Sequence, residues 1–70
     1  MHKAYCHINA EAGDLNPILK EVLKVPGVVE AHKVLGIYDI IAKVEAPSLE
    51  TIIDIIVNEV GTIPGVAATS

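Results

Sequence analysis

The sequence predicts an α+β domain whose elements follow the order β-α-β-β-α-β. Two observations support this prediction. Along the chain, segments whose apolar residues alternate, as in a strand, are interspersed with segments whose apolar residues recur at helical spacing. In addition, an apolar-Pro-Gly-Val exit follows each predicted helix, at Val25–Val28 and again at Ile63–Val66. The chain is therefore two β-α-β halves. Right-handed crossovers then place both helices on one face of a four-stranded antiparallel sheet, the ferredoxin-like arrangement.

The first strand is predicted from Ala4 to Ala10, where side chains alternate between two faces of the sheet. The small apolar set, which suits helices packed above it, is Ala4, Cys6, Ile8 and Ala10, and the mixed set is Tyr5, His7 and Asn9. Residues 11–14 are predicted to form a loop. This strand therefore separates a helix-facing side of the sheet from an open side.

The first helix is predicted to begin near Pro17, with Asp14 or Asn16 as its N-cap. Proline is tolerated there because the first turn of a helix has no N–H partner to lose. The apolar stripe at helical spacing is Leu15, Ile18, Leu19, Val22 and Leu23. Pro26 and Gly27 then end the helix.

Two apolar runs, over residues 28–34 and 40–46, predict a central β-hairpin with its tip at Gly36. A two-residue type II′ turn fits, with Gly36 and Ile37 at its centre, because glycine takes a positive φ without strain. The turn places Tyr38 and Asp39 at the start of the later strand. In that strand, one face is predicted to carry Ile40, Ala42, Val44 and Ala46. A bulge in the earlier strand stays open as an alternative.

A second helix is predicted from Leu49 to about Gly61, with Ser48 as its N-cap. Its many β-branched residues make a strand the competing interpretation. The cap, the length and the interspersed acidic residues favour a helix. Its apolar stripe is wide enough to indicate contacts on more than one side. The last strand begins at Val66 and is short, because the sequence stops at Ser70.

The composition predicts a single small domain, residues 1–70, that self-associates. A domain of this size buries only about 60% of the surface of its unfolded chain. Yet 51% of the residues are hydrophobic, and the mean hydropathy is +0.50. Part of the open sheet face is too apolar to remain exposed to solvent. The residues of this face are Tyr5, His7, Asn9, His32, Val34, Ile41 and Lys43. Two sheets packed face to face would bury it.

The charge balance argues against several classes of partner. Nine acidic residues oppose five lysines, which gives a formal net charge of −4. A direct nucleic-acid partner is disfavoured because phosphate binding needs a clustered basic face. The apolar runs are far too short to span a bilayer. Without a leader-like start, and with Cys6 as the single cysteine, the sequence predicts a cytoplasmic protein.

The run from Val25 to Val44 closely resembles the ligand-binding module of the Lrp/AsnC regulator family, also called the RAM (regulation of amino acid metabolism) domain. The shared pattern is a Pro-Gly-Val exit, a histidine or aromatic residue in the second strand, Gly-x-Tyr-Asp, an apolar strand and a second Pro-Gly-Val. The resemblance covers essentially the whole chain. The 70 residues contain no helix-turn-helix segment, and therefore resemble stand-alone forms of the module that regulate through association.

The resemblance implies a dimeric α+β barrel that assembles further into octameric or decameric rings of dimers. Small effectors, commonly amino acids, would bind between dimers near Gly-x-Tyr-Asp. The implied ligand-binding residues are Gly36, Ile37, Tyr38, Asp39, Thr69 and Ser70. The expected interface residues are Tyr5, His7, His32, Val34 and Ile41. A separate DNA-binding regulator of the family is a candidate partner. The family's last strand usually continues several residues beyond the equivalent of Ser70.

Purely structural roles compete with these assignments. Gly36 would then only make the turn, Tyr38 would pack across strands, and Asp39 would accept hydrogen bonds from nearby backbone N–H groups. The three histidines fall short of a zinc site, which needs three or four converging ligands, and neither a metal nor a cofactor is expected. Cys6 is expected to be a small buried apolar residue.

Two other functional classes remain as alternatives. A dimeric α+β barrel enzyme of the monooxygenase or isomerase type shares the predicted architecture, and so does an ACT-type regulatory or purely structural domain. A barrel enzyme of the monooxygenase or isomerase type needs a polar cavity between helices and sheet. Here that layer consists of alanine, isoleucine, valine and leucine, and no pair of acidic residues suggests catalysis. We therefore expect a binding module and not an enzyme.

Overall fold

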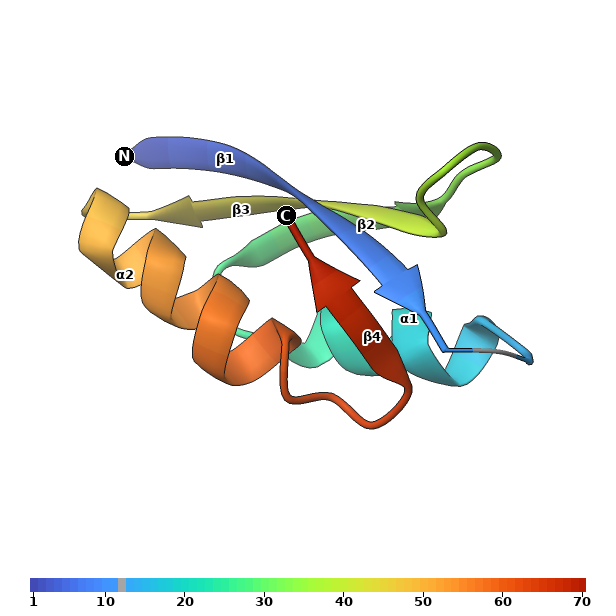
Figure 1. Ribbon diagram of the computed structural model, residues 1–70. Helices are drawn as coiled ribbons and strands as arrows, with labels where there is room; N and C mark the ends of the chain where they lie inside the picture. Colours follow the sequence, from blue (N-terminus) through green and yellow to red (C-terminus); the bar gives the residue numbers. More distant parts are fainter. Residues whose placement is uncertain (12) are drawn as a thin grey trace.

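A computed structural model of the chain, which describes residues 1–11 and 13–70, has the predicted order of elements (Figure 1). The strands are β1 (His2–Ala10), β2 (Val28–Lys33), β3 (Ile40–Ala46) and β4 (Val66–Thr69). The helices are α1 (Asn16–Lys24), α2 (Leu49–Asp54) and the π-helical continuation η1 (Ile55–Val60). The loop predicted over residues 11–14 includes Ala12, which lies outside the described residues.

The four strands form one antiparallel sheet in the order β2-β3-β1-β4. β1 and β3 are central, with Ile8 opposite Ile40. β2 and β4 are the edges, and Ile8 also lies opposite Thr69 of β4. Figure 1 shows both helices on the same side of this sheet. The ferredoxin-like fold class is therefore confirmed.

A single apolar core fills the layer between sheet and helices. The predicted alternation of β3 is confirmed, because Ile40, Ala42, Val44 and Ala46 are all buried. Cys6 and Ile8 of β1 meet them from the neighbouring strand. The remaining buried side chains are Ile18, Val22, Ala31, Ile52, Ile55 and Val60. Every buried side chain among the described residues is apolar or a thiol.

The two Pro-Gly exits adopt the same turn. Val28 N–H donates to Val25 C=O at 3.1 Å, and Val66 N–H donates to Ile63 C=O at 3.1 Å. Gly27 has φ +99° and Gly65 has φ +96°. Proline followed by a residue with positive φ is the pattern of a type II turn. The internal repeat in the sequence thus corresponds to a repeat in backbone conformation.

Ser48 caps α2 as predicted, because its hydroxyl oxygen accepts from Thr51 N–H at 3.1 Å. The N-cap predicted for α1, Asp14 or Asn16, is wrong: Leu15 occupies that position and makes no side-chain cap. Asp14, one residue earlier, accepts from Asn16 N–H at 2.9 Å and satisfies that donor from outside the helix. The second helix spans the predicted residues but changes its pitch after Asp54, where η1 begins. The wider winding begins within a segment dense in β-branched side chains, Ile52 to Val57.

The prediction of a two-residue turn at Gly36 is wrong. Residues 34–39 all lie between β2 and β3, and the loop closes by a hydrogen bond from Val34 N–H to Asp39 C=O at 3.0 Å. Gly36 does take a positive φ, +129°. The loop is wider because Asp39 bonds to β1, as described below, so that regular pairing of β3 with β2 starts only at Ile40.

The bulge left open for the second strand is present. The register between β2 and β3 shifts between Val28, which lies opposite Val44, and Glu30, which lies opposite Lys43. Val28 therefore faces the helices, whereas Glu30 and His32 share the open face.

No helix within residues 1–11 and 13–70 combines the length and apolar character needed to cross a bilayer.

Candidate functional site

The candidate site forms where the β2–β3 loop meets the second half of β1. Asp39 attaches to β1 by two hydrogen bonds. Its backbone N–H donates to Ile8 C=O at 3.0 Å, and its carboxylate Oδ2 accepts from Ala10 N–H at 2.7 Å. The Asp39 side chain is half-buried. The structural role predicted for Asp39, accepting from a backbone N–H, is therefore confirmed.

Tyr38 packs on the open face of the sheet. Its ring centroid lies 4.5 Å from that of His7, with the ring planes tilted by 30°. Both residues are half-buried. Since offset and tilted aromatic pairs are favourable at this separation, the contact fixes the Tyr38 ring against β1. The cross-strand packing predicted for Tyr38 is confirmed.

Thr69 and Ser70 meet the same part of β1 from its other edge. His7 N–H donates to Ser70 C=O at 2.8 Å, and Ser70 N–H donates back to His7 C=O at 2.9 Å. Thr69 lies opposite Ile8. Four of the six predicted ligand-binding residues thus lie beside residues 7–10 of β1, with β1 between the Tyr38–Asp39 pair and the Thr69–Ser70 pair. Thr69, opposite the buried Ile8, belongs to the helix side of the sheet and does not share the face that carries Tyr38.

The other two predicted ligand residues extend away from β1. Gly36 and Ile37 form the tip of the loop together with Leu35. Leu35 is fully exposed, and Ile37 is 82% exposed. Figure 1 shows this loop projecting beyond the end of the sheet. Only Tyr38 and Asp39 of the Gly-x-Tyr-Asp motif therefore contact the strand that forms the base of the site.

Asn9 is a polar residue of this region that the sequence did not single out for a site. It follows Ile8 in β1 and lies opposite Ala68. Its amide Oδ1 is buried and accepts no hydrogen bond from the described part of the chain. Because a buried acceptor is costly to leave unpaired, Asn9 adds hydrogen-bonding capacity beside Asp39. The signal in the sequence was an amide in β1 next to the buried Ile8.

A family model describing the Lrp/AsnC ligand binding domain matches residues 3–70. The chain belongs to this family. A relative in Pyrococcus furiosus, an HTH-type transcriptional regulator of uncharacterized function, is 36% identical over 52 residues. These residues make up 74% of this chain and 35% of the relative. The Lrp/AsnC domain described here therefore spans about a third of the curated relative.

Solved structures place the same fold over nearly the whole chain. The crystal structure of FFRP-DM1 superposes with a TM-score of 0.91 at 31% identity, covering 100% of this chain and 93% of that one. A transcriptional regulator of Neisseria meningitidis, solved as an L-Met complex, has a TM-score of 0.82 at 16% identity. The match covers 97% of this chain and 46% of that one. The resemblance predicted from the Pro-Gly-Val and Gly-x-Tyr-Asp motifs is confirmed.

The Lrp/AsnC domain offers distinct chemistry on the two sides of its sheet. On the open side, Asp39 presents a half-exposed carboxylate that can pair with a cationic group. On the helix side, burial raises the pKa of the Cys6 thiol, so this group is a poor nucleophile. The ionic and hydrogen-bonding groups suited to a ligand thus lie at the loop and on the open face.

Proposed function

We propose that this Lrp/AsnC domain binds an amino-acid effector at the base of the β2–β3 loop. We further propose that it regulates by self-association instead of binding DNA itself. The observation that carries the proposal is the anchoring of Asp39, whose carboxylate is held at 2.7 Å by Ala10 N–H beside the Tyr38–His7 ring pair. The formal net charge of −4 supports the absence of direct DNA contact.

An α-amino acid suits the groups present. Its α-ammonium would pair with the Asp39 carboxylate, a charge-assisted contact. Its α-carboxylate would take backbone N–H groups of the loop around Gly36. Its side chain would then lie toward Tyr38. The L-Met complex of the Neisseria meningitidis regulator supports this class of effector.

A screen of the twenty amino acids by thermal unfolding tests the proposal. A ligand that binds only the native state adds about 2.7 kcal/mol at a concentration of 100 Kd. For a domain of this size, that corresponds to a rise in Tm of roughly 10 °C or more. One or a few amino acids should produce it, and their N-acetyl derivatives, which lack the ammonium, should not. The absence of any response at millimolar concentrations would contradict the proposal.

The open sheet face is proposed as the dimer interface. Tyr5, 61% exposed, and His32 lie on it with the half-buried Ile41 and His7. Val34, also assigned to the interface, is half-buried at the end of this face. An ion pair between Lys43 Nζ and Glu45 Oε2, at 3.6 Å, lies along β3 on the same surface. Packing two such faces together would bury apolar area that a 70-residue chain cannot cover by itself.

Light scattering coupled to gel filtration tests this interface. The wild-type chain is expected to elute at the mass of a dimer or a multiple of it at micromolar concentration. Tyr5→Lys should shift the population toward monomer, because it replaces an exposed aromatic ring of this face with a second lysine opposite Lys43. Lys20→Ala, an exposed change on α1, is the control. A wild-type monomer would contradict the interface.

A further inference from the structure

The open sheet face carries two histidines in one row across three strands. His7 of β1 and His32 of β2 both lie opposite Ile41 of β3. Opposed residues of an antiparallel sheet share a face. Cys6 and Ile8, the chain neighbours of His7, are buried toward the helices, so the row faces the other way. The two histidines therefore flank Ile41 on the face proposed as the dimer interface.

A partner cannot bury Ile41 without also covering both histidines. Neighbouring strands lie about 4.8 Å apart, so each imidazole stands one strand away from Ile41. In the single subunit, His7 is half-buried against Tyr38, and His32 is exposed. A second sheet laid on this face would remove the remaining solvent from both rings. Association through the open face is thus coupled to the desolvation of two histidines in each subunit.

Few ionisable groups share the open face with these histidines. Glu45 pairs with Lys43 at 3.6 Å, and the Asp39 carboxylate accepts from Ala10 N–H. From β4, the Ser70 carboxyl oxygen accepts from the His7 backbone N–H at 2.8 Å. The ionisable side chains of this face are Lys3, Tyr5, Glu30, Tyr38, Asp39, Lys43 and Glu45. With neutral histidines, the charges of the face nearly balance.

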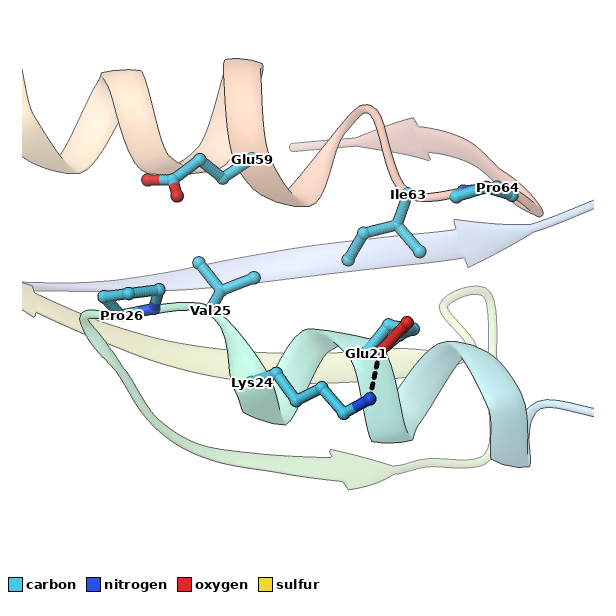
Figure 2. Close-up of a pocket in the computed structure, with 7 residues that line it drawn as sticks. All are labelled: Glu21, Lys24, Val25, Pro26, Glu59, Ile63 and Pro64. Carbon is cyan, nitrogen blue, oxygen red and sulfur yellow. Dashed lines mark ion pairs between the residues drawn. The ribbon is translucent and has the colours of Figure 1, made fainter.

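The charged side chains of the helices lie on the other side of the sheet, where Figure 1 shows both helices. Figure 2 shows three of them, Glu21, Lys24 and Glu59, around a groove of about 370 Å³ beside the two Pro-Gly turns. Glu21 and Lys24 pair with each other at 3.0 Å. The sheet and the apolar core separate these groups from the histidines, so they do not compensate a charge on either ring.

Protonation of these histidines is costly only in the assembled state. Histidine in water titrates near about pH 6.5. Burial without a paired anion disfavours the charged imidazolium. A face-to-face dimer would bury two such rings from each subunit, together with Lys43. The dimer therefore binds fewer protons than two free subunits, and by linkage a falling pH favours the free subunits.

We propose that His7 and His32 make self-association through the open sheet face sensitive to acid. The domain is then a dimer near neutral pH, and it dissociates as the two histidines become protonated. This inference rests on the interface proposed above. It concerns the pH dependence of that interface, which the two histidines determine, and it does not depend on effector binding.

Sedimentation equilibrium at about pH 7.5 and about pH 5.5, at one ionic strength, tests the inference. Carboxylates titrate near about pH 4 and stay ionised over this range, so histidine is the side chain whose charge changes. Each histidine kept neutral in the dimer should raise the dissociation constant by about tenfold between the two pH values. The wild-type constant should rise by about a hundredfold or more. Circular dichroism establishes that the chain is folded at both pH values.

Three variants separate the two histidines from other groups. His7→Gln/His32→Gln removes both titrating rings, and its dissociation constant should change by less than about threefold between the two pH values. His32→Gln alone retains the His7–Tyr38 contact and should show an intermediate change. His2→Gln is the matched control, because His2 is exposed and lies opposite the buried Ala46, on the helix side. It should behave like the wild type. Comparing each variant with itself at two pH values cancels any effect on dimer strength.

Failure of the inference and failure of the interface give different results. A wild-type dimer of equal strength at both pH values would leave the interface standing and overturn the role of the histidines. Tighter association in acid would show that an imidazolium pairs with a carboxylate such as Glu30 across the interface, and would also overturn it. A pH dependence that persists in the double variant would do the same. A wild-type monomer at both pH values, up to about 1 mM, would overturn the inference and the interface together.

Discussion

Asp39→Asn is expected to abolish the thermal response to the effector while leaving the domain folded. The asparagine amide oxygen can still accept from Ala10 N–H, which the carboxylate now binds at 2.7 Å. It cannot offer a negative charge to an α-ammonium. The free energy of unfolding without ligand should fall by about 1 kcal/mol or less, the difference between a charge-assisted and a neutral hydrogen bond.

Asp39→Ala serves as the matched comparison. It removes both the charge and the acceptor, so it should lose the effector response and also about 1–2 kcal/mol of unfolding free energy, because Ala10 N–H is left without its partner. Chemical denaturation and thermal unfolding with and without the effector separate the two contributions. If Asp39→Asn retained the full response, the carboxylate would have a structural role only.

Gly27→Ala is expected to destabilise the domain by about 2–3 kcal/mol. Gly27 has φ +99°, where a residue with a Cβ is strained. A Cβ there would also lie 2.7 Å from Ile55 Cδ1 and 3.3 Å from the Glu45 backbone oxygen. Gly27 cannot shift freely, because its own C=O accepts from Glu45 N–H at 2.8 Å.

Gly13→Ala is the control for the strain alone. Gly13 has φ +90°, and a Cβ there would meet no atom within 4 Å. It should lose only about 1 kcal/mol. Urea unfolding of both variants gives the comparison. Equal losses would show that the close contact with Ile55 and Glu45 has no energetic weight, and that the turn conformation alone determines the requirement for glycine.

Most of the fold was predictable because its signals are local and repeated. The alternation in residues 40–46, the Ser48 cap and the two Pro-Gly exits each determine a neighbouring stretch of backbone, and all three are present in the structure. The winding of η1 was not predictable. A π-helix aligns residues five apart, as the buried Ile55 and Val60 are, but the run of apolar residues from Ile55 to Val57 is also compatible with α-helical spacing.

The sequence singled out Tyr38 and Asp39 but not Asn9, and it did not predict how these residues are arranged. Tyr38 and Asp39 stand out as polar residues between apolar strands, yet their partners, His7 and Ala10, are about thirty positions away in the sequence. The two-residue turn failed for the same reason. Local turn preference favoured a tight hairpin at Gly36, whereas the bonds of Asp39 to β1 hold the loop open.

The strand order β2-β3-β1-β4 makes the two repeated halves of this chain depend on each other. Within the first half, β1 and β2 are not neighbours, because β3 lies between them. Within the second half, β3 and β4 are separated by β1. Neither half alone contains a pair of adjacent strands, and every ladder of hydrogen bonds joins one half to the other. The interleaving therefore makes folding cooperative across the full length of the chain, since even the local β2–β3 hairpin joins one half to the other.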